Sequence, residues 1–145
     1  MKKFSREIAV SVVAVLAGLL LGCAAAPAGK PPYPCELAGS VWVPAVPRKG
    51  AYLEFTADRR AVGSTGPNRY FAPVKCAPGK RIRVSPVAYT KLRGELDEWE
   101  MRFFQALDDT RGYVFDGDKL TLYSEERQPL FELKMLRAPR KADQR

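Results

Sequence analysis

The chain has 145 residues, with 24 Lys and Arg against 16 Asp and Glu, a formal net charge of +8, and no histidine. This length is enough for one domain with a single core. The lack of histidine removes the usual general base, the catalytic triads built on it, and the commonest zinc ligand. Composition therefore argues against an enzyme, and we predict no catalytic residue, metal ligand or cofactor.

The amino-terminal residues have the layout of an export signal. MKKFSR carries three cations, and an apolar run from Ile8 to Leu21 follows. This run is shorter than the roughly 20 apolar residues of a transmembrane helix, so it is typical of a secretory signal peptide. It ends in Leu20-Leu21-Gly22-Cys23, which resembles the bacterial lipobox. We expect residues 1–22 to be a lipoprotein signal peptide and Cys23 to be lipidated. The alternative is a plain signal peptide cleaved near Ala24-Ala25-Ala26.

Export and anchoring predict where the domain works and what it meets. Residues 23–34 are rich in Ala, Pro and Gly, a composition that forms a tether. Ala24 stands where sorted lipoproteins with another destination have Asp, and this favours the outer membrane, facing the periplasm. The expected partners are the membrane, through the lipid anchor, and an envelope protein or an anionic envelope polymer, because the mature chain is basic. Export argues against nucleic acid.

Two further cysteines, Cys35 and Cys76, follow the tether. An even pair in an exported protein suggests a disulfide. Such a bond would contribute about 3 to 4 kcal/mol in the loop-entropy account.

Short strand-like segments begin after Cys35. Tyr52-Leu53-Glu54-Phe55 and Arg81-Ile82-Arg83-Val84 alternate in polarity, which predicts one buried and one exposed face for each. Before the helix, the expected strands cover residues 41–43, 52–55, 61–63, 70–72, 81–84 and 87–90.

One amphipathic helix interrupts the strands. Asp97 and Glu100 have the spacing of a capping box, and Gly112 is expected to end the helix. The predicted inward stripe consists of Trp99, Phe103, Phe104 and Leu107.

The strands resume after the helix. Residues 113–115 and 119–123 flank Asp116-Gly117-Asp118, which predicts a hairpin, and residues 131–135 alternate again. Residues 137–145 form a basic tail, expected to be solvated, with contact to an anionic surface as the alternative. The fold class is mainly β (α+β): a small antiparallel β-barrel of about seven strands with one amphipathic helix, since closure hides strand edges.

Several segments together resemble a known family, the META domain of the HslJ-like heat-shock lipoproteins. The resemblance lies in the order and spacing of the segments and covers roughly Glu36 to Met135. The segments are Leu37-Ala38-Gly39-Ser40-Val41-Trp42, Leu53-Glu54-Phe55, Arg60-Ala61-Val62-Gly63, Gly66-Pro67-Asn68-Arg69-Tyr70-Phe71, Pro86-Val87-Ala88-Tyr89-Thr90, the helix from Glu100 to Leu107, and Gly117-Asp118-Lys119-Leu120-Thr121-Leu122.

The resemblance implies a lipocalin-like β-barrel over residues 35–136, located in a bacterial envelope and connected with heat shock and drug tolerance, without an assigned activity. Family members commonly carry cysteines at Pro67 and near Arg93, and both are missing here. Their joint loss is expected if the Cys35–Cys76 bond replaces theirs. Asn68 and Arg69 are the most family-like polar residues, with a structural turn and a binding role as the two interpretations.

Three functions remain open at this point. The leading one is a non-enzymatic, lipid-anchored envelope protein that supports outer-membrane integrity or stress and drug tolerance by binding a ligand or a protein. The second is a lipoprotein inhibitor of a lysozyme-like or other hydrolase, although a basic domain is repelled by basic lysozymes. The third is an envelope hydrolase, which would need a deep pocket with a serine beside a buried lysine.

Overall fold

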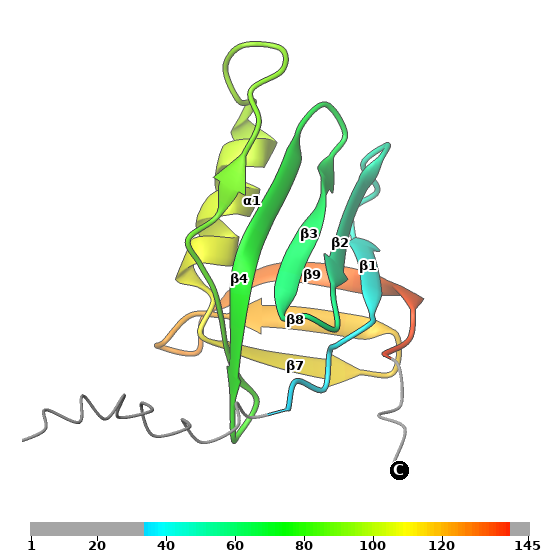
Figure 1. Ribbon diagram of the computed structural model, residues 1–145, viewed down its shortest axis with the longest axis vertical. Coiled ribbons are helices and arrows are strands. Elements are labelled where there is room, and N and C mark those ends of the chain that lie inside the picture. Colours follow the sequence, from blue (N-terminus) through cyan, green and yellow to red (C-terminus); the bar gives the residue numbers. More distant parts are fainter. Residues whose placement is uncertain (1–33, 140–145) are drawn as a thin grey trace, which may run out of the picture. The chain divides into compact units, whose positions relative to one another are not determined.

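The structure is a computed structural model that describes residues 34–139. The predicted signal peptide, Cys23 and the end of the basic tail lie outside the described residues. The described part contains nine strands and one helix (Figure 1). They are β1 (Val41–Pro44), β2 (Ala51–Phe55), β3 (Arg60–Thr65), β4 (Arg69–Ala77), β5 (Arg81–Val84), β6 (Ala88–Tyr89), α1 (Glu98–Asp109), β7 (Gly112–Asp116), β8 (Lys119–Tyr123) and β9 (Pro129–Arg137).

The predicted mainly β fold with one helix is confirmed. About seven strands were expected and nine are present, because every candidate segment forms a strand, including the two-residue β6. Helix α1 also begins where the capping box predicted. Strand β9 extends to Arg137, the first residue of the expected tail.

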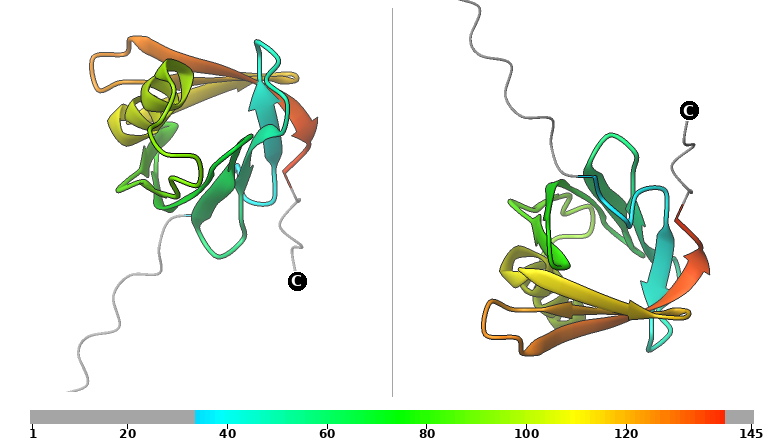
Figure 2. Two further views of the ribbon diagram at one scale, coloured as in Figure 1. Left: turned by 90° about the horizontal axis from the view of Figure 1, so that it is seen from above. Right: turned by 90° about the horizontal axis from the view of Figure 1, so that it is seen from below.

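The strands form one antiparallel sheet that closes on itself. Neighbouring strands pair in the order β3-β2-β1-β9-β8-β7-β5-β4, and β4 pairs in turn with β3. Figure 2 shows the strands around a common interior from both ends. Strand β6 adds to β4 outside this ring. Closure leaves few unpaired strand edges, which is the physical reason for expecting it.

Strand β4 has nine residues and changes its pairing partner along its length. Residues 69–73 pair with β3, whereas residues 74–77 pair with β5. Nine strand residues at about 3.3 Å each place the two ends of β4 more than about 20 Å apart. Features at the two ends of β4 are therefore separate surfaces.

The pairing between β5 and β7 is the sparsest in the ring. It has a single register pair, Arg81 with Gly112. The bond from the Ile82 N–H to the Arg111 carbonyl is 3.0 Å long, and the bond from the Tyr113 N–H to the Lys80 carbonyl is also 3.0 Å. Helix α1 packs against β5, β8 and β9.

Helix α1 buries the predicted apolar stripe. Phe103, Phe104 and Leu107 are at most 4% exposed, and the Trp99 ring stacks on the Phe103 ring. The prediction that Gly112 ends the helix is wrong: the helix ends at Asp109 with Thr110 as its C-cap, and Gly112 is the first residue of β7. The Thr110 hydroxyl donates to the Ala106 carbonyl, which satisfies the helix end without a left-handed glycine. Within residues 34–139, no helix is both long and apolar enough to cross a bilayer.

The interior follows the alternation seen in the sequence. Leu53 and Phe55 are buried while Tyr52 and Glu54 are not. In the same way Ile82 and Val84 are buried, and the arginines that alternate with them are exposed. The largest fully buried side chains include Trp42, Phe55, Phe103, Leu120, Leu122 and Leu133.

Candidate functional site

The structure places Cys35 and Cys76 in a disulfide, as the sequence suggested. Their Cα atoms are 5.4 Å apart, and the residues are 41 positions apart in the chain. The bond ties the segment before β1 to the end of β4, beside the sparse seam between β5 and β7. It therefore acts as a covalent clamp at this end of the ring.

Asn68 lies at the opposite end of β4 and is 3% exposed. Its amide nitrogen donates to Glu100 Oε1 at 2.8 Å, and its amide oxygen accepts from the Leu92 N–H at 2.9 Å. The amide oxygen also accepts from the Thr90 hydroxyl at 3.3 Å. Both polar atoms of the Asn68 side chain are thus used within the protein, which favours the structural interpretation of this residue.

Glu100 is the centre of these contacts, and it is 2% exposed. One oxygen accepts from Asn68 and from the Thr65 hydroxyl at 2.5 Å, and the other accepts from the Asp97 N–H at 3.0 Å. Burial by itself would raise the pKa of Glu100, but the hydrogen bonds from Thr65, Asn68 and Asp97 outweigh it and lower this pKa. We call Thr65, Asn68, Glu100 and the residues that hydrogen-bond to them the Asn68 end of β4.

Arg48 reinforces the helix start at this end. Its guanidinium pairs with Asp97 and lies over the Trp99 ring, 4.4 Å from the ring centroid. The Arg48 bond is the main reason that the pKa of Asp97 is lowered, and the Glu100 N–H contributes further. The capping box therefore also joins the helix to the segment before β2.

Arg69, the other family-like residue, is exposed at the start of β4. Its guanidinium donates to the Tyr52 hydroxyl at 3.3 Å, and its N–H donates to the Thr90 hydroxyl at 3.0 Å. A binding role for Arg69 stays a prediction, because the contacts that the structure shows for this exposed strand residue are all within the protein.

The charged hollow of the molecule lies at the other end of β4. A cavity of about 770 Å³ opens between β5 and β7 under the turn that follows β8, and a second of about 260 Å³ adjoins it over the β4–β5 hairpin. The two share Arg81, Arg111 and Glu125 in their linings. We call the combined surface the basic groove. Its cations are Lys75, Lys80, Arg81, Arg83, Arg111 and Arg127.

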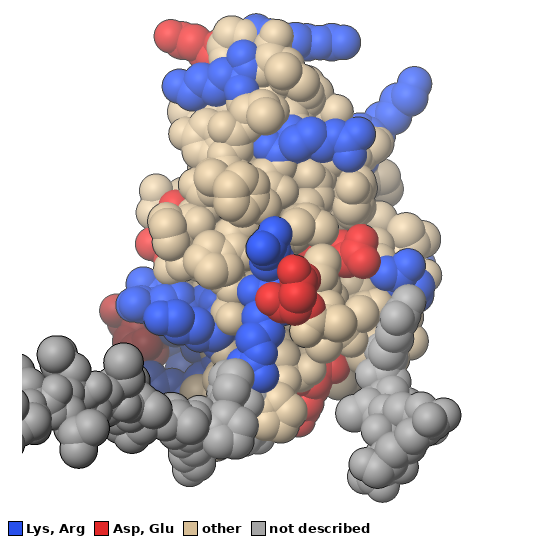
Figure 3. Space-filling view, viewed as in Figure 1, with Lys and Arg blue, Asp and Glu red and all other residues tan. Residues whose placement is uncertain are grey.

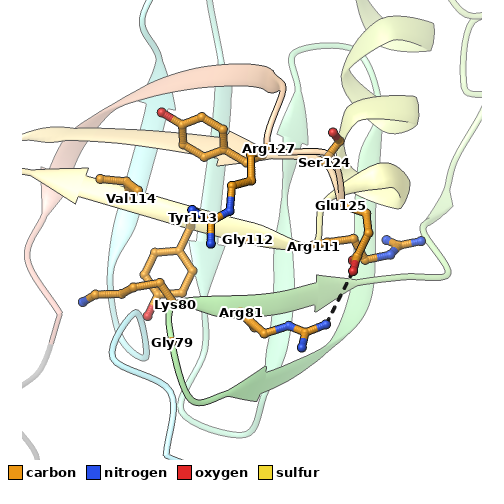
Figure 4. A pocket seen from close by; sticks show the side chains of 11 residues that line it. Gly79, Lys80, Arg81, Arg111, Gly112, Tyr113, Val114, Ser124, Glu125 and Arg127 are labelled. Carbon is orange, nitrogen blue, oxygen red and sulfur yellow. Dashed lines mark ion pairs between the residues drawn. The ribbon is translucent and has the colours of Figure 1, made fainter.

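Glu125 is the one acidic residue among the side chains that line the groove. Its carboxylate faces Arg81 at 3.7 Å, and Figure 4 shows this pair across the opening between β5 and the turn after β8. Both side chains are about two thirds exposed, at 66% and 63%, so water screens the attraction. In Figure 3, Lys and Arg side chains gather at the lower left of the visible face, where α1 ends and β7 begins in Figure 1.

Strand pairing brings like charges together in the groove. Lys75 on β4 is the direct register partner of Arg83 on β5, and both point outward with Arg81. Like charges directly opposite on a sheet are unfavourable by a few tenths of a kcal/mol. This arrangement does not serve the stability of the hairpin, and it produces a positive surface that an anion would neutralise.

The remaining groove cations differ in how many partners their side chains have within the protein. Arg111 donates through Nη1 to the Asp108 and Thr110 carbonyls, which holds its guanidinium near the end of α1. Lys80 pairs with Glu36, and this contact is the main cause of the lowered pKa of Glu36. The Arg127 side chain makes no hydrogen bond or ion pair within residues 34–139, and Figure 4 shows it reaching from its turn across β7.

The floor of the groove is formed at Gly112, the partner of Arg81. A Cβ atom placed on Gly112 would meet only the Lys80 carbonyl, at 3.5 Å, which is an ordinary contact. The absence of a side chain at this position leaves space above β7 between the two arginines, Arg81 and Arg111.

This chemistry is suited to holding an anion. Guanidinium and ammonium groups donate charge-assisted hydrogen bonds to phosphate and carboxylate oxygens. Ser124 also lines the groove, but no lysine is buried among residues 34–139, so the described part does not contain the serine and buried lysine that a hydrolase would need. The described residues also hold no cluster of three or more potential metal ligands.

The groove could not be identified from the sequence alone. The alternation at residues 81–84 correctly indicated an outward face with two arginines, which is one part of it. The pairing of Lys75 with Arg83, and the approach of Arg111 and Arg127, depend on strand neighbours far apart in the chain.

Comparisons with known proteins identify the domain. The chain matches the family model of the META domain over residues 36–135. A comparison with curated proteins finds no match. Among solved structures, a DUF4847 family protein from Bacteroides vulgatus is similar, with 20% sequence identity and a TM-score of 0.46. The likeness covers 65% of this chain and 62% of the length of that protein.

The family match covers more than half of the chain and includes all nine strands and the helix, apart from the last two residues of β9. The chain belongs to the META domain family.

Proposed function

We propose that this protein is a lipid-anchored, non-enzymatic component of a bacterial envelope that binds an anionic envelope component through the basic groove and thereby supports outer-membrane integrity under stress. The observation that carries the binding role is the charge balance of the groove, six cations against one acid. Membership of the META family agrees with the HslJ-like role expected from the sequence. The lipobox resemblance at Cys23 supplies the anchor in this proposal.

The same charge balance argues against inhibition of a lysozyme. An inhibitor of a basic enzyme needs an acidic surface, because opposite charges speed the encounter and like charges slow it. The basic groove of this domain has the opposite sign. The charge of the groove therefore does not favour a second function as a lysozyme inhibitor.

The groove part of the proposal is tested in cells that lack the gene. The strain is complemented with the wild-type chain, with the groove variant Arg81→Gln/Arg83→Gln, or with the control Lys91→Gln/Arg93→Gln. The control removes the same charge from the loop beyond β6, where both side chains are exposed. We expect the wild type and the control to restore detergent tolerance and the groove variant to fail, at equal protein levels. Full restoration by the groove variant would contradict the binding role.

The anchor is tested separately. The Cys23→Ser variant should lose metabolic labelling by palmitate and should leave the membrane fraction, whereas Cys35→Ser should keep both. Membrane association and labelling that persist in Cys23→Ser would remove the anchor from the proposal.

A further inference from the structure

The shape of the basic groove limits the kind of anion that it can hold. Its two hollows have volumes of about 770 and 260 Å³ and meet at Arg81, Arg111 and Glu125. They therefore adjoin and form one depression rather than two independent sites. A single small anion would occupy only a fraction of it.

The cations are distributed along this whole depression. Lys80 and Arg127 lie only in the larger hollow, Lys75 and Arg83 only in the smaller one, and the shared arginines connect them. Arg81 and Arg83 are on the same face of β5, two residues apart, which places their Cα atoms about 7 Å from each other. Positive charge is thus repeated along the groove, whereas a site for one phosphate would gather it at a point.

Glu125 occupies the middle of the depression as an internal counter-ion. Its contact with Arg81 is long, at 3.7 Å, and both side chains are well exposed on a turn and a strand end. Such pairs contribute little to folding, so an external anion can replace the Glu125 carboxylate at small cost. Removal of this acid should strengthen anion binding.

We propose that the basic groove binds an anionic polymer, a chain with repeated phosphate or carboxylate groups, which lies along both hollows and displaces Glu125 from Arg81. This inference rests on the proposed function and specifies its ligand class. The concave form favours a chain over a bilayer surface, because a flat array of headgroups would reach only the rim.

The test is calorimetric titration of the full chain in a nonionic detergent. Linear inorganic polyphosphate and polygalacturonate are the two chain probes, and orthophosphate and galacturonate are the matched monomers. The bilayer probe is used without detergent: the chain is reconstituted into phosphatidylcholine vesicles, and its binding to added vesicles of phosphatidylglycerol and phosphatidylcholine is measured. We expect at least one polymer to bind at least about tenfold tighter than its monomer at equal anion concentration, with affinity that falls steeply with salt as contacts of several cations require. Which polymer binds identifies the anionic group.

Three variants locate the binding. Arg81→Gln/Arg83→Gln should weaken polymer binding at least about tenfold, and Glu125→Gln should strengthen it about two- to fivefold. Lys91→Gln/Arg93→Gln, the matched loss of two charges elsewhere, should change it less than about twofold. Thermal unfolding of each variant checks that the fold is retained.

The failures are distinguishable. If monomer and polymer bind with equal affinity, and the groove variant binds neither, the inference that the ligand is a polymer is wrong but the proposed anion site stands. Binding to vesicles without binding to either polymer would likewise contradict the inference that the ligand is a polymer. Failure of every anionic probe, or equal weakening by the groove and control variants, would overturn the proposed function as well.

Discussion

The two ends of strand β4 are stabilised in opposite ways. At the Asn68 end, the buried Glu100 carboxylate accepts hydrogen bonds from Thr65, Asn68 and Asp97. The rings of Tyr70 on β4 and Phe103 on α1 pack edge to face, with centroids 5.3 Å apart. At the Lys75 end, cations face one another across the β4–β5 hairpin, and the neighbouring β5–β7 seam has a single register pair. The Cys35–Cys76 disulfide lies one residue before the end of β4.

The residues at the Asn68 end stabilise the fold, whereas those at the Lys75 end are available for binding. The family-like Asn68 uses its polar atoms inside the protein. Of the groove cations, Lys75, Arg83 and Arg127 make no side-chain hydrogen bond or ion pair within residues 34–139. Unbalanced charge and sparse pairing are costs that a binding surface tolerates when another element supplies stability, here a covalent clamp. The variants below test this division, beginning with the largest expected effect.

Loss of the clamp should cost most. Cys35→Ser/Cys76→Ser should lower the free energy of unfolding by about 4 kcal/mol, because the loop of 41 positions is no longer closed in the unfolded chain. Urea unfolding of the variant measures this, and the reduced wild-type protein should match it. A loss below about 1 kcal/mol would show that the groove end does not need the bond.

A methyl group at Gly63 should disrupt the opposite end. Its Cβ would lie 2.1 Å from the Tyr52 carbonyl oxygen and 2.5 Å from the Tyr70 hydroxyl oxygen. The Tyr70 hydroxyl donates a 2.7 Å hydrogen bond to this carbonyl. Because one clashing atom is backbone, Gly63→Ala should cost about 3 kcal/mol. The control is Gly112→Ala on the groove floor, where the nearest atom is 3.5 Å away and the change should be within about 0.5 kcal/mol. Equal effects at both glycines would contradict the packing difference.

Replacement of the buried carboxylate should cost somewhat less. Glu100→Gln substitutes a donor for an acceptor opposite Asn68 and should lower the free energy of unfolding at pH 7 by about 2 kcal/mol. The exposed neighbour variant Glu98→Gln should change it by less than about 0.5 kcal/mol.

The same residue predicts a pH dependence. Because folding lowers the pKa of Glu100, its contribution is complete above its usual value of 4.5 and is lost as the pH falls through the lower folded pKa. Urea midpoints of the wild-type chain should therefore decrease below about pH 4.5, and Glu100→Gln should show a shallower decrease. Parallel curves for the two proteins would assign the acid sensitivity to other carboxylates.

The smallest effect should have the opposite sign. Lys75→Gln removes one of two like charges that face each other and should raise the free energy of unfolding by about 0.3 kcal/mol. The gain should be largest at low salt, since screening weakens the repulsion. Chemical unfolding at two salt concentrations measures it, and a loss of stability on substitution would mean that Lys75 has a structural role.

Local patterns predicted the local structure well. The alternation around Leu53 and Ile82 identified buried faces, and the spacing of Asp97 and Glu100 identified the helix start, because these signals depend on residues close in the chain. Gly112 was misread as a helix stop, since Thr110 ends the helix by bonding to the preceding turn.

Long-range pairing accounts for what was missed. Neither the change of partner along β4 nor the meeting of Lys75 with Arg83 is visible in a single segment, and Arg127 comes near β7 only through the turn after β8. Asn68 was singled out by its family resemblance and Glu100 by the capping box, but the hydrogen bond between them, across 32 positions of the chain, could not be predicted.

The central claim is that the basic groove, and not the Asn68 end, is the binding surface of this META domain. Titration of the isotopically labelled full chain with linear polyphosphate, followed by amide chemical shifts, tests it most directly. We predict shifts concentrated at residues 75–83, 111–114 and 124–127, with residues 65–71 and 90–93 unchanged. Shifts centred on residues 65–71, or spread evenly over all exposed cations, would contradict it.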